Sequence, residues 1–196
     1  MADCTVLAAK RDYAAATCAV DLESNADCYS EVEKKAFALL ARLYDWQREW
    51  TGDKENFYLE IPAAGEDLPP FLTILEFSSD FTAIRLLTYL SALINVLRIL
   101  NSLPLDGKDE YIAAERSAAL DICRCVPYFL VRKSNLDLRT VHLAVATAWI
   151  SLLHRETARS EHKMWRGFCK GIVGCLMDWR GRRTIVLSFS ECVLEH

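Results

Sequence analysis

The first residues whose type could support chemistry are two cysteines one residue apart, in the run AALDICRCVPYFL at 118–130. Cys123 and Cys125 could be metal ligands, a redox pair or packing side chains. Residues two apart on a helix point roughly 200° away from each other, so the pair cannot hold one ion or form a disulfide while this run is helical. A cysteine among Ile, Val and Ala behaves as a small hydrophobic side chain. We therefore expect both cysteines to pack in the core.

The remaining cysteines and histidines carry no metal signature. The chain has eight cysteines and four histidines, with no CxxC pair and no Cys/His cluster at zinc-finger spacing. It also lacks a basic-then-apolar secretion signal at its N-terminus, which predicts free thiols in a reducing compartment. We expect no metal and no cofactor, and a cytoplasmic location, or a nuclear one for a regulator.

A polar stripe runs along the apolar segment 81–102. Its members recur every three or four residues, so they share one helical face. The stripe is either a thin solvent-facing strip or the lining of a cavity in which polar groups orient an apolar ligand. Tyr89 borders it and can donate a hydrogen bond in either case. The stripe consists of Arg85, Thr88, Ser91, Asn95, Arg98 and Ser102.

His142 is the candidate for acid–base chemistry. It shares an apolar helical face with Ala146, Trp149 and Leu153. It is either a satisfied core histidine or a general acid or polarising donor, and the second role needs a substrate within hydrogen-bond reach. His154 lies on a more polar face, and no acid or nucleophile stands at triad spacing with either histidine.

Large aromatic side chains are frequent, and they form either an aromatic core or the wall of a pocket for a polyene or terpenoid. In the pocket hypothesis His142 or Tyr89 is the catalytic, polarising donor, and Arg85, Tyr128 and Trp149 bind the substrate. The aromatic residues concerned are Trp46, Trp50, Trp149, Trp165, Tyr44, Tyr89 and Tyr128.

Helices must position these residues, because helical periodicity covers nearly the whole chain. Its 196 residues are 52% hydrophobic, enough for one core in one domain. The formal net charge of −4 gives no bulk attraction for nucleic acid or an anionic membrane. The most apolar run, 84–100, is interrupted by Arg85 and Arg98 and fits a core helix better than a membrane helix.

We predict an all-α fold, a single-domain bundle of about six helices over 1–193, with a long irregular loop at 51–70. Residues 194–196 fit the remnant of a cloning scar and tag. Ser30 is the expected cap of the second helix, Ser79 or Asp80 that of the third, and Pro127 is expected to stop or kink the fourth. The helices are expected over about 2–20, from Ser30 through Trp50, 80–102, 109–126, after the 135–137 turn to about 157, and 160–179.

Several segments carry a resemblance to a known family. From 37 to 187 the chain contains LYDWQREW, LPPFLTILEF, LLTYLSALINVLRIL, AALDICRCVPYFL, VHLAVATAWISLL and MWRGFCKGIVGCLMDW. Together they resemble the C-terminal part of the regulatory domain of fungal zinc-cluster transcription factors. The six-cysteine binuclear zinc module of that family is missing from this sequence, where only Cys4, Cys18 and Cys28 stand near the N-terminus. The resemblance implies an all-helical fold with room for an effector, and no direct DNA binding by this chain.

Two functions from different classes follow. The first is a cofactor-independent enzyme of fungal secondary metabolism, a cyclase or isomerase of the cycloaddition type acting on an apolar polyketide or terpenoid. A shaped cavity with one or two donors suffices for such chemistry. The alternative is the effector or interaction domain of a transcription regulator. Both predict an apolar small-molecule partner and neither a nucleic acid nor a membrane, and a homodimer stays open.

Overall fold

The computed structural model describes residues 2–18, 25–63, 73–105, 107–132 and 138–153. All of them belong to one compact unit made by residues 1–64 and 71–156. Several predictions fall outside the described residues: the helix at 160–179, the tag remnant at 194–196, His154 and Trp165.

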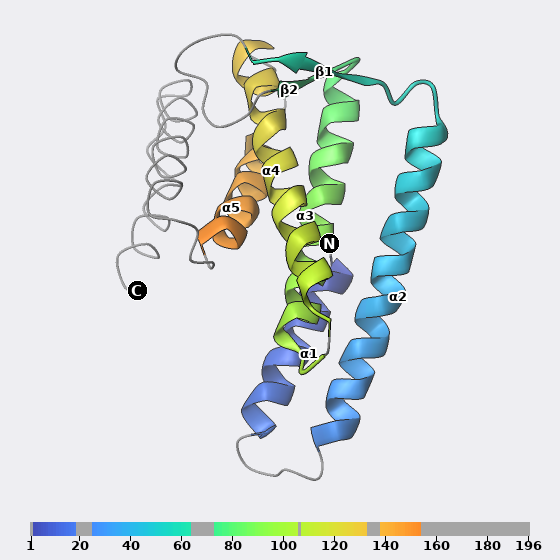
Figure 1. The fold of residues 1–196 in the computed structure, drawn as a ribbon, viewed down its shortest axis with the longest axis vertical. Coiled ribbons are helices and arrows are strands. Elements are labelled where there is room, and N and C mark those ends of the chain that lie inside the picture. Colours follow the sequence, from blue (N-terminus) through green and yellow to red (C-terminus); the bar gives the residue numbers. More distant parts are fainter. Residues whose placement is uncertain (1, 19–24, 64–72, 106, 133–137, 154–196) are drawn as a thin grey trace. The chain divides into compact units, whose positions relative to one another are not determined.

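Five helices and two short strands make up the described part of the chain (Figure 1). The prediction of a mostly helical fold is confirmed, and a small sheet is added to it. The helices are α1 (Ala2–Cys18), α2 (Asn25–Gly52), α3 (Asp80–Ser102), α4 (Asp109–Arg132) and α5 (Leu138–Leu153), and the strands are β1 (Tyr58–Pro62) and β2 (Thr73–Phe77).

Helix α3 is the centre of this unit, in contact with α1, α2, α4, α5 and β2. Its leucines Leu87, Leu97 and Leu100 are fully buried. The helix begins as predicted, because the Ser79 side chain caps it and accepts a hydrogen bond from the Thr82 backbone N–H at 3.1 Å. By length and composition α3 could cross a membrane, but 72% of its most apolar window is buried inside this unit. Its apolar character is that of a core helix.

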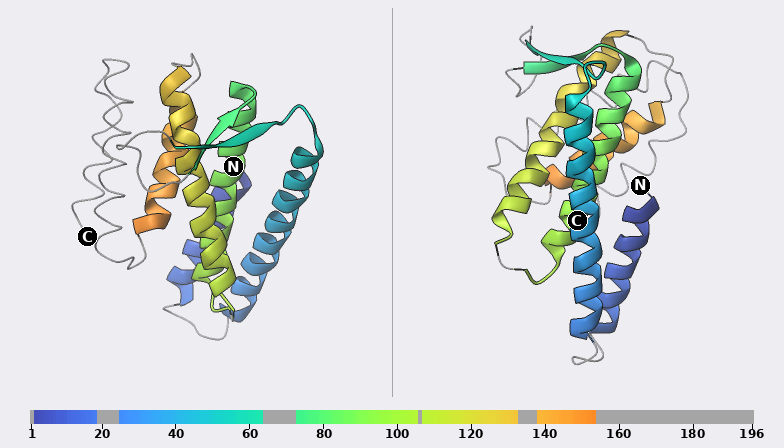
Figure 2. Two further views of the ribbon diagram at one scale, coloured as in Figure 1. Left: turned by 45° about the horizontal axis from the view of Figure 1, so that its top comes forward. Right: turned by 90° about the vertical axis from the view of Figure 1, so that its right-hand side faces the viewer.

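The two strands correct the prediction of an irregular loop over 51–70. They pair antiparallel, with Tyr58 opposite Phe77 and Ile61 opposite Ile74, and cross one end of the helices (Figure 2). Alternate side chains of β2, Leu75 and Phe77, are buried, while the facing strand is largely exposed. A two-stranded ribbon is marginal alone, so its packing against α4 and α3 stabilises it.

Two predicted helix boundaries are also wrong. Helix α2 begins at Asn25, so Ser30 lies inside it and is not its cap. Pro127 does not stop α4, which continues to Arg132, so the predicted end at 126 is wrong, and the kink stays a prediction. A proline removes one backbone hydrogen bond from a helix, and burial of Val126, Tyr128 and Phe129 around it offsets that loss.

The packing role predicted for the two cysteines of α4 is confirmed. Neither Cys123 nor Cys125 is in a disulfide, and they are 1% and 0% exposed. Burial raises the pKa of the Cys125 thiol, so it stays protonated and is a poor nucleophile.

Replacing Leu97 with alanine should lower the free energy of unfolding by about 2–5 kcal/mol, because the leucine is fully buried in α3. The matched control is Leu143→Ala in α5, where the side chain is 54% exposed and the loss should stay below about 1 kcal/mol. Urea unfolding followed by circular dichroism measures both. Equal losses would contradict the central position of α3.

Candidate functional site

A row of stacked aromatic rings joins α2, α3 and the sheet. The Trp46 ring stacks on Trp50, with centroids 5.8 Å apart, and on Tyr89, with centroids 5.0 Å apart. Trp50 in turn stacks on Tyr58 of β1 at 5.8 Å. Helical spacing explains the first step, since residues four apart lie on one face of α2. These tryptophans of α2 therefore hold the sheet and α3.

The row continues into α4. Tyr58 contacts Phe77 of β2 at 5.8 Å, and Phe77 meets Tyr128 edge to face at 5.2 Å. Tyr128 is 2% exposed, and its hydroxyl donates to Asp80 Oδ1 at 2.9 Å. The hydrogen bond ties α4 to the first residue of α3. Tyr128, predicted to bind substrate, is thus part of a helix-to-helix joint.

Arg85 and Tyr89 are brought together on the same tryptophan. The Arg85 guanidinium lies 5.6 Å from the Trp46 ring centre and 5.4 Å from that of Phe81. Such cation–π contacts suit a half-buried arginine, because the ring faces replace part of its hydration. Of the five predicted site residues, these two share a direct neighbour.

The Tyr89 hydroxyl already has an acceptor. It donates to Gln47 Oε1 at 2.8 Å, and the residue is 5% exposed. Burial raises the pKa of Tyr89, and nearby Tyr44 adds to the effect. The phenol therefore stays protonated at neutral pH and holds α2 against α3.

Next to Tyr89 lies a small polar hollow of about 80 Å³. Arg124 of α4 dominates it, with Nη2 2.6 Å from Glu60 Oε2 and Nη1 2.9 Å from Asp121 Oδ1. The same guanidinium donates to the Thr73 carbonyl and hydroxyl oxygens, at 3.3 and 2.6 Å. One arginine thus joins α4 to both strands. The hollow is lined by Gln47, Tyr58, Glu60, Leu75, Leu86, Tyr89, Leu90, Asp121 and Arg124.

Asp121 is the carboxylic acid that this environment perturbs toward its neutral form. Burial raises its pKa above the ordinary value, and the hydrogen bond from Arg124 offsets this only in part. Burial also disfavours the charge on Arg124, but its hydrogen bonds with Asp121 and Glu60 leave its pKa raised. The two residues form a partly desolvated ion pair in which burial disfavours the charged form of the acid.

Sequence reasoning missed these ionic residues. Arg124 stands inside the cysteine run that we interpreted as packing, and Asp121 is one helical turn before it. A charged pair three residues apart in the otherwise apolar run 118–130 was the available signal. Glu60 could not be found, because it lies in the segment predicted to be an irregular loop.

The two remaining predicted residues lie on α5. Trp149 is buried and His142 is half-buried, and neither lines the hollow beside Tyr89. The structure therefore joins Tyr89, Arg85 and Tyr128 through the aromatic row, and His142 and Trp149 are placed on another helix.

The hydroxyls of the polar stripe on α3 point back to their own helix. Thr88, Ser91 and Ser102 donate to the carbonyls of Ile84, Leu87 and Ile99, at 2.9, 2.8 and 2.7 Å. Such bonds satisfy the hydroxyls locally, so these three groups do not need a ligand.

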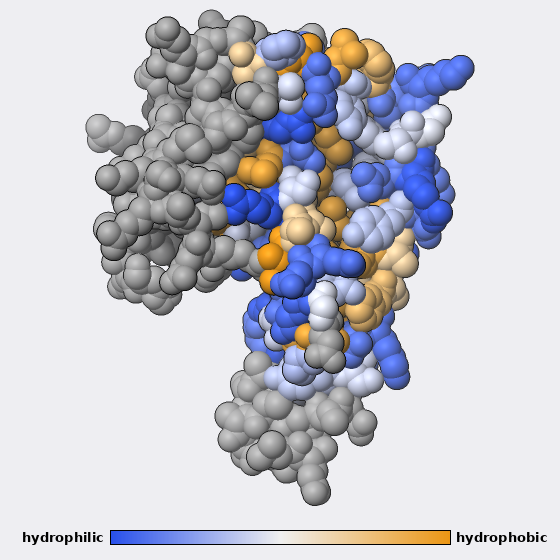
Figure 3. All heavy atoms as spheres, in the orientation of Figure 1, coloured by the Kyte–Doolittle hydropathy of each residue, from blue (hydrophilic) through white to orange (hydrophobic). Residues whose placement is uncertain are grey.

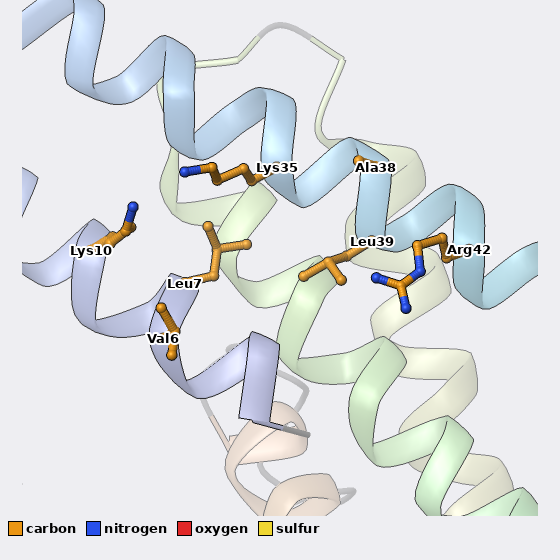
Figure 4. A pocket seen from close by; sticks show the side chains of 7 residues that line it. All are labelled: Val6, Leu7, Lys10, Lys35, Ala38, Leu39 and Arg42. Atoms are coloured by element: carbon orange, nitrogen blue, oxygen red, sulfur yellow. The ribbon is translucent and has the colours of Figure 1, made fainter.

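The largest of the hollows described here is a groove of about 390 Å³ between α1 and α2. Figure 4 shows the amines of Lys10 and Lys35 approaching each other at one end and the Arg42 guanidinium at the other, with leucine side chains between them. The groove is lined by Val6, Leu7, Lys10, Lys35, Ala38, Leu39 and Arg42.

The lysine end of the groove already holds one carboxylate. Glu31 Oε1 lies 3.4 Å from Lys10 Nζ and also pairs with Lys35. Hydrogen bonding to Lys35 lowers the pKa of Glu31, which keeps it ionised. Lys10 of α1 and Lys35 of α2 thus face Glu31 at one end of an apolar floor, and Arg42 lines the other end. Hydrophilic and hydrophobic side chains are mixed over the side of the molecule that α2 forms (Figure 3).

No protein-family model, no curated protein and no solved structure matches this chain.

Arg124→Ala should lower the free energy of unfolding by about 1–3 kcal/mol, because it leaves Asp121 and the Thr73 carbonyl without their charged donor. Arg48→Ala is the control: Arg48 pairs with Asp45 on the surface and its side chain is 79% exposed. Thermal and urea unfolding of both variants decide the matter. If Arg124→Ala lowered the free energy of unfolding no more than Arg48→Ala does, the role of Arg124 in joining α4 to both strands would be contradicted.

The stability difference between wild type and Asp121→Asn should depend on pH. Because folding raises the pKa of Asp121 above its ordinary value of 3.8, the carboxyl favours the folded state most at low pH. That contribution is lost as pH rises through the folded-state pKa, so wild type weakens relative to Asp121→Asn. Urea unfolding between about pH 4 and pH 7 measures it, with Asp45→Asn as an exposed control. If wild type instead became more stable relative to Asp121→Asn as pH rises, the predicted direction of the pKa shift of Asp121 would be wrong.

Proposed function

We propose that this chain is an effector-binding regulatory domain, the alternative function considered from the sequence, and that its effector occupies the groove between α1 and α2. The observation that carries the proposal is the groove itself, whose volume of about 390 Å³ lies in the usual ligand range of about 300–1,000 Å³. Its floor is apolar and its rim carries Lys10, Lys35 and Arg42.

The charge of the rim defines the class of effector. The whole chain is acidic, with a formal net charge of −4, so three cations around one groove are a local departure from that balance. Glu31 offsets one of these charges at the lysine end. The cationic side chains of the rim suit a carboxylate or similar head group, and the leucines suit an alkyl or polyene body. We infer an anionic amphiphile.

The described polar hollow supports a structural role better than a catalytic one. At about 80 Å³ it has room for two or three waters, each of which takes about 30 Å³ in the liquid, and not for a polyketide. Its donors are committed as well: Tyr89 to Gln47, and Arg124 to both strands. A catalytic site stabilises its transition state with hydrogen-bond donors that point at a reacting atom. The donors of this hollow instead bond to acceptors of the protein itself.

The complete domain in this proposal is the six-helix, single-domain bundle predicted from the sequence, with 160–179 as its sixth helix. The sequence resemblance to regulatory domains of fungal zinc-cluster factors supports it, as does the mostly helical fold. DNA contact is assigned to another chain or segment, and a nuclear location is expected.

The enzyme hypothesis keeps one observation in its favour. Asp121 has a raised pKa and lines the same hollow as Tyr89, and a perturbed acid in a cleft is typical of acid–base sites. A cofactor-free cyclase or isomerase would then admit only the polar end of its substrate. Conversion of linear polyene precursors tests it by mass spectrometry. Tyr89→Phe and His142→Ala should lower turnover at least tenfold in this hypothesis, about 1.4 kcal/mol of barrier each.

Dodecanoate should bind the groove, and the double variant Lys35→Gln/Arg42→Gln should weaken binding at least about tenfold, or 1.4 kcal/mol. The matched control is Lys34→Gln, because Lys34 is the exposed neighbour of Lys35 and does not line the groove. Isothermal titration calorimetry measures all three proteins, with circular dichroism to verify that each is folded.

Dodecyltrimethylammonium, which has the same chain and the opposite charge, should bind more weakly than dodecanoate. Equal binding of the two amphiphiles, or equal loss in Lys34→Gln and the double variant, would rule out a charge-selective groove. Recovery of the bound dodecanoate unchanged is expected of a regulatory domain.

A further inference from the structure

A second hollow, of about 250 Å³, lies where α1 packs against α3. It is separate from the groove with α2, because the two share no lining residue. The lining side chains include two arginines and an asparagine and no acid. They are Cys4, Thr5, Ala8 and Arg11 from α1, and Asn95, Arg98 and Ile99 from α3.

Arg98 is the unusual residue of this hollow. It is half-buried on the core helix, between Leu97 and Ile99, which are both buried. Within the part of the chain that the structure describes, its guanidinium has no ion pair and no hydrogen bond. Taking a charge out of water without a partner is costly, so such a position favours a counterion.

The neighbouring groups increase the demand for an anion. Arg11 faces the same hollow, and its guanidinium pairs with Asp12 through Nε at 2.8 Å and Nη2 at 2.5 Å, leaving Nη1 unused in that pair. Asn95 donates one amide hydrogen to the Ser91 carbonyl at 2.9 Å, and its amide nitrogen has a second. Asp12 balances the charge of Arg11, so among the described residues the charge without a partner at this hollow is that of Arg98, and Arg11 and Asn95 add donors beside it.

We propose that this hollow binds a compact oxoanion, a phosphate or carboxylate group, with Arg98 as the main ligand and Arg11 and Asn95 as further donors. A guanidinium presents paired N–H groups that match two oxygens of such an anion. The volume exceeds that of a bare phosphate, and Ala8 and Ile99 offer a small apolar surface beside the donors. A small organic phosphate or carboxylate therefore fits, as does the free ion.

The test measures the thermal midpoint of the whole chain with inorganic phosphate, phenyl phosphate or acetate, at constant ionic strength set with chloride. At about ten times a millimolar Kd, a specific anion should raise the midpoint by about 3–6 °C. Arg98→Gln should abolish this shift, and Arg98→Lys should retain part of it. Arg48→Gln, an exposed arginine on α2, should leave it unchanged.

Arg98→Gln should also be at least as stable as wild type without an added anion, since it removes a half-buried charge that lacks a partner. That result separates loss of binding from loss of folding. A larger shift with phenyl phosphate than with inorganic phosphate identifies an organic monoester, and the reverse identifies the free ion. No anion-dependent shift in wild type, or an equal shift in wild type and Arg98→Gln, would overturn the proposal.

Discussion

A helix that is apolar on nearly every side has to be surrounded, and α3 imposes this constraint on the rest of the unit. Its buried residues face α1, α2, α4 and α5 in turn, so each of these helices is held by the same central surface. Burial of apolar surface supplies most of the favourable free energy but has no direction. It brings helices together without specifying how they are aligned.

Polar and aromatic contacts supply the alignment. Tyr89 with Gln47 sets α2 against α3, and Tyr128 with Asp80 sets α4 against the start of α3. Arg124 then fixes the sheet to α4. Because an unmade hydrogen bond in a buried place costs more than a made one contributes, these pairs penalise every other alignment. Residues that looked like candidates for chemistry are here used to hold the fold.

The helices of this chain were largely predictable from its sequence. The side-chain contacts that hold the helices and the sheet together were not. Ser79 and the 80–102 periodicity define α3, and the apolar neighbours of Cys123 and Cys125 predict their burial. The sheet was missed because prolines and charges surround it and because its stability comes from contacts with α3 and α4. Glu60 and Arg124 are 64 positions apart, and no local pattern reports a pair of that separation.

Helix α1 forms one wall of the groove with α2 and one wall of the hollow with α3. Its main contacts within the described unit are with these same two helices. A ligand in either place therefore stabilises the docked position of α1 that the other place requires. If both proposed ligands need this docked position, the binding of one favours the binding of the other. Linkage requires that each of the two proposed ligands would then raise the affinity for the other by the same factor, so α1 would couple the two proposed sites.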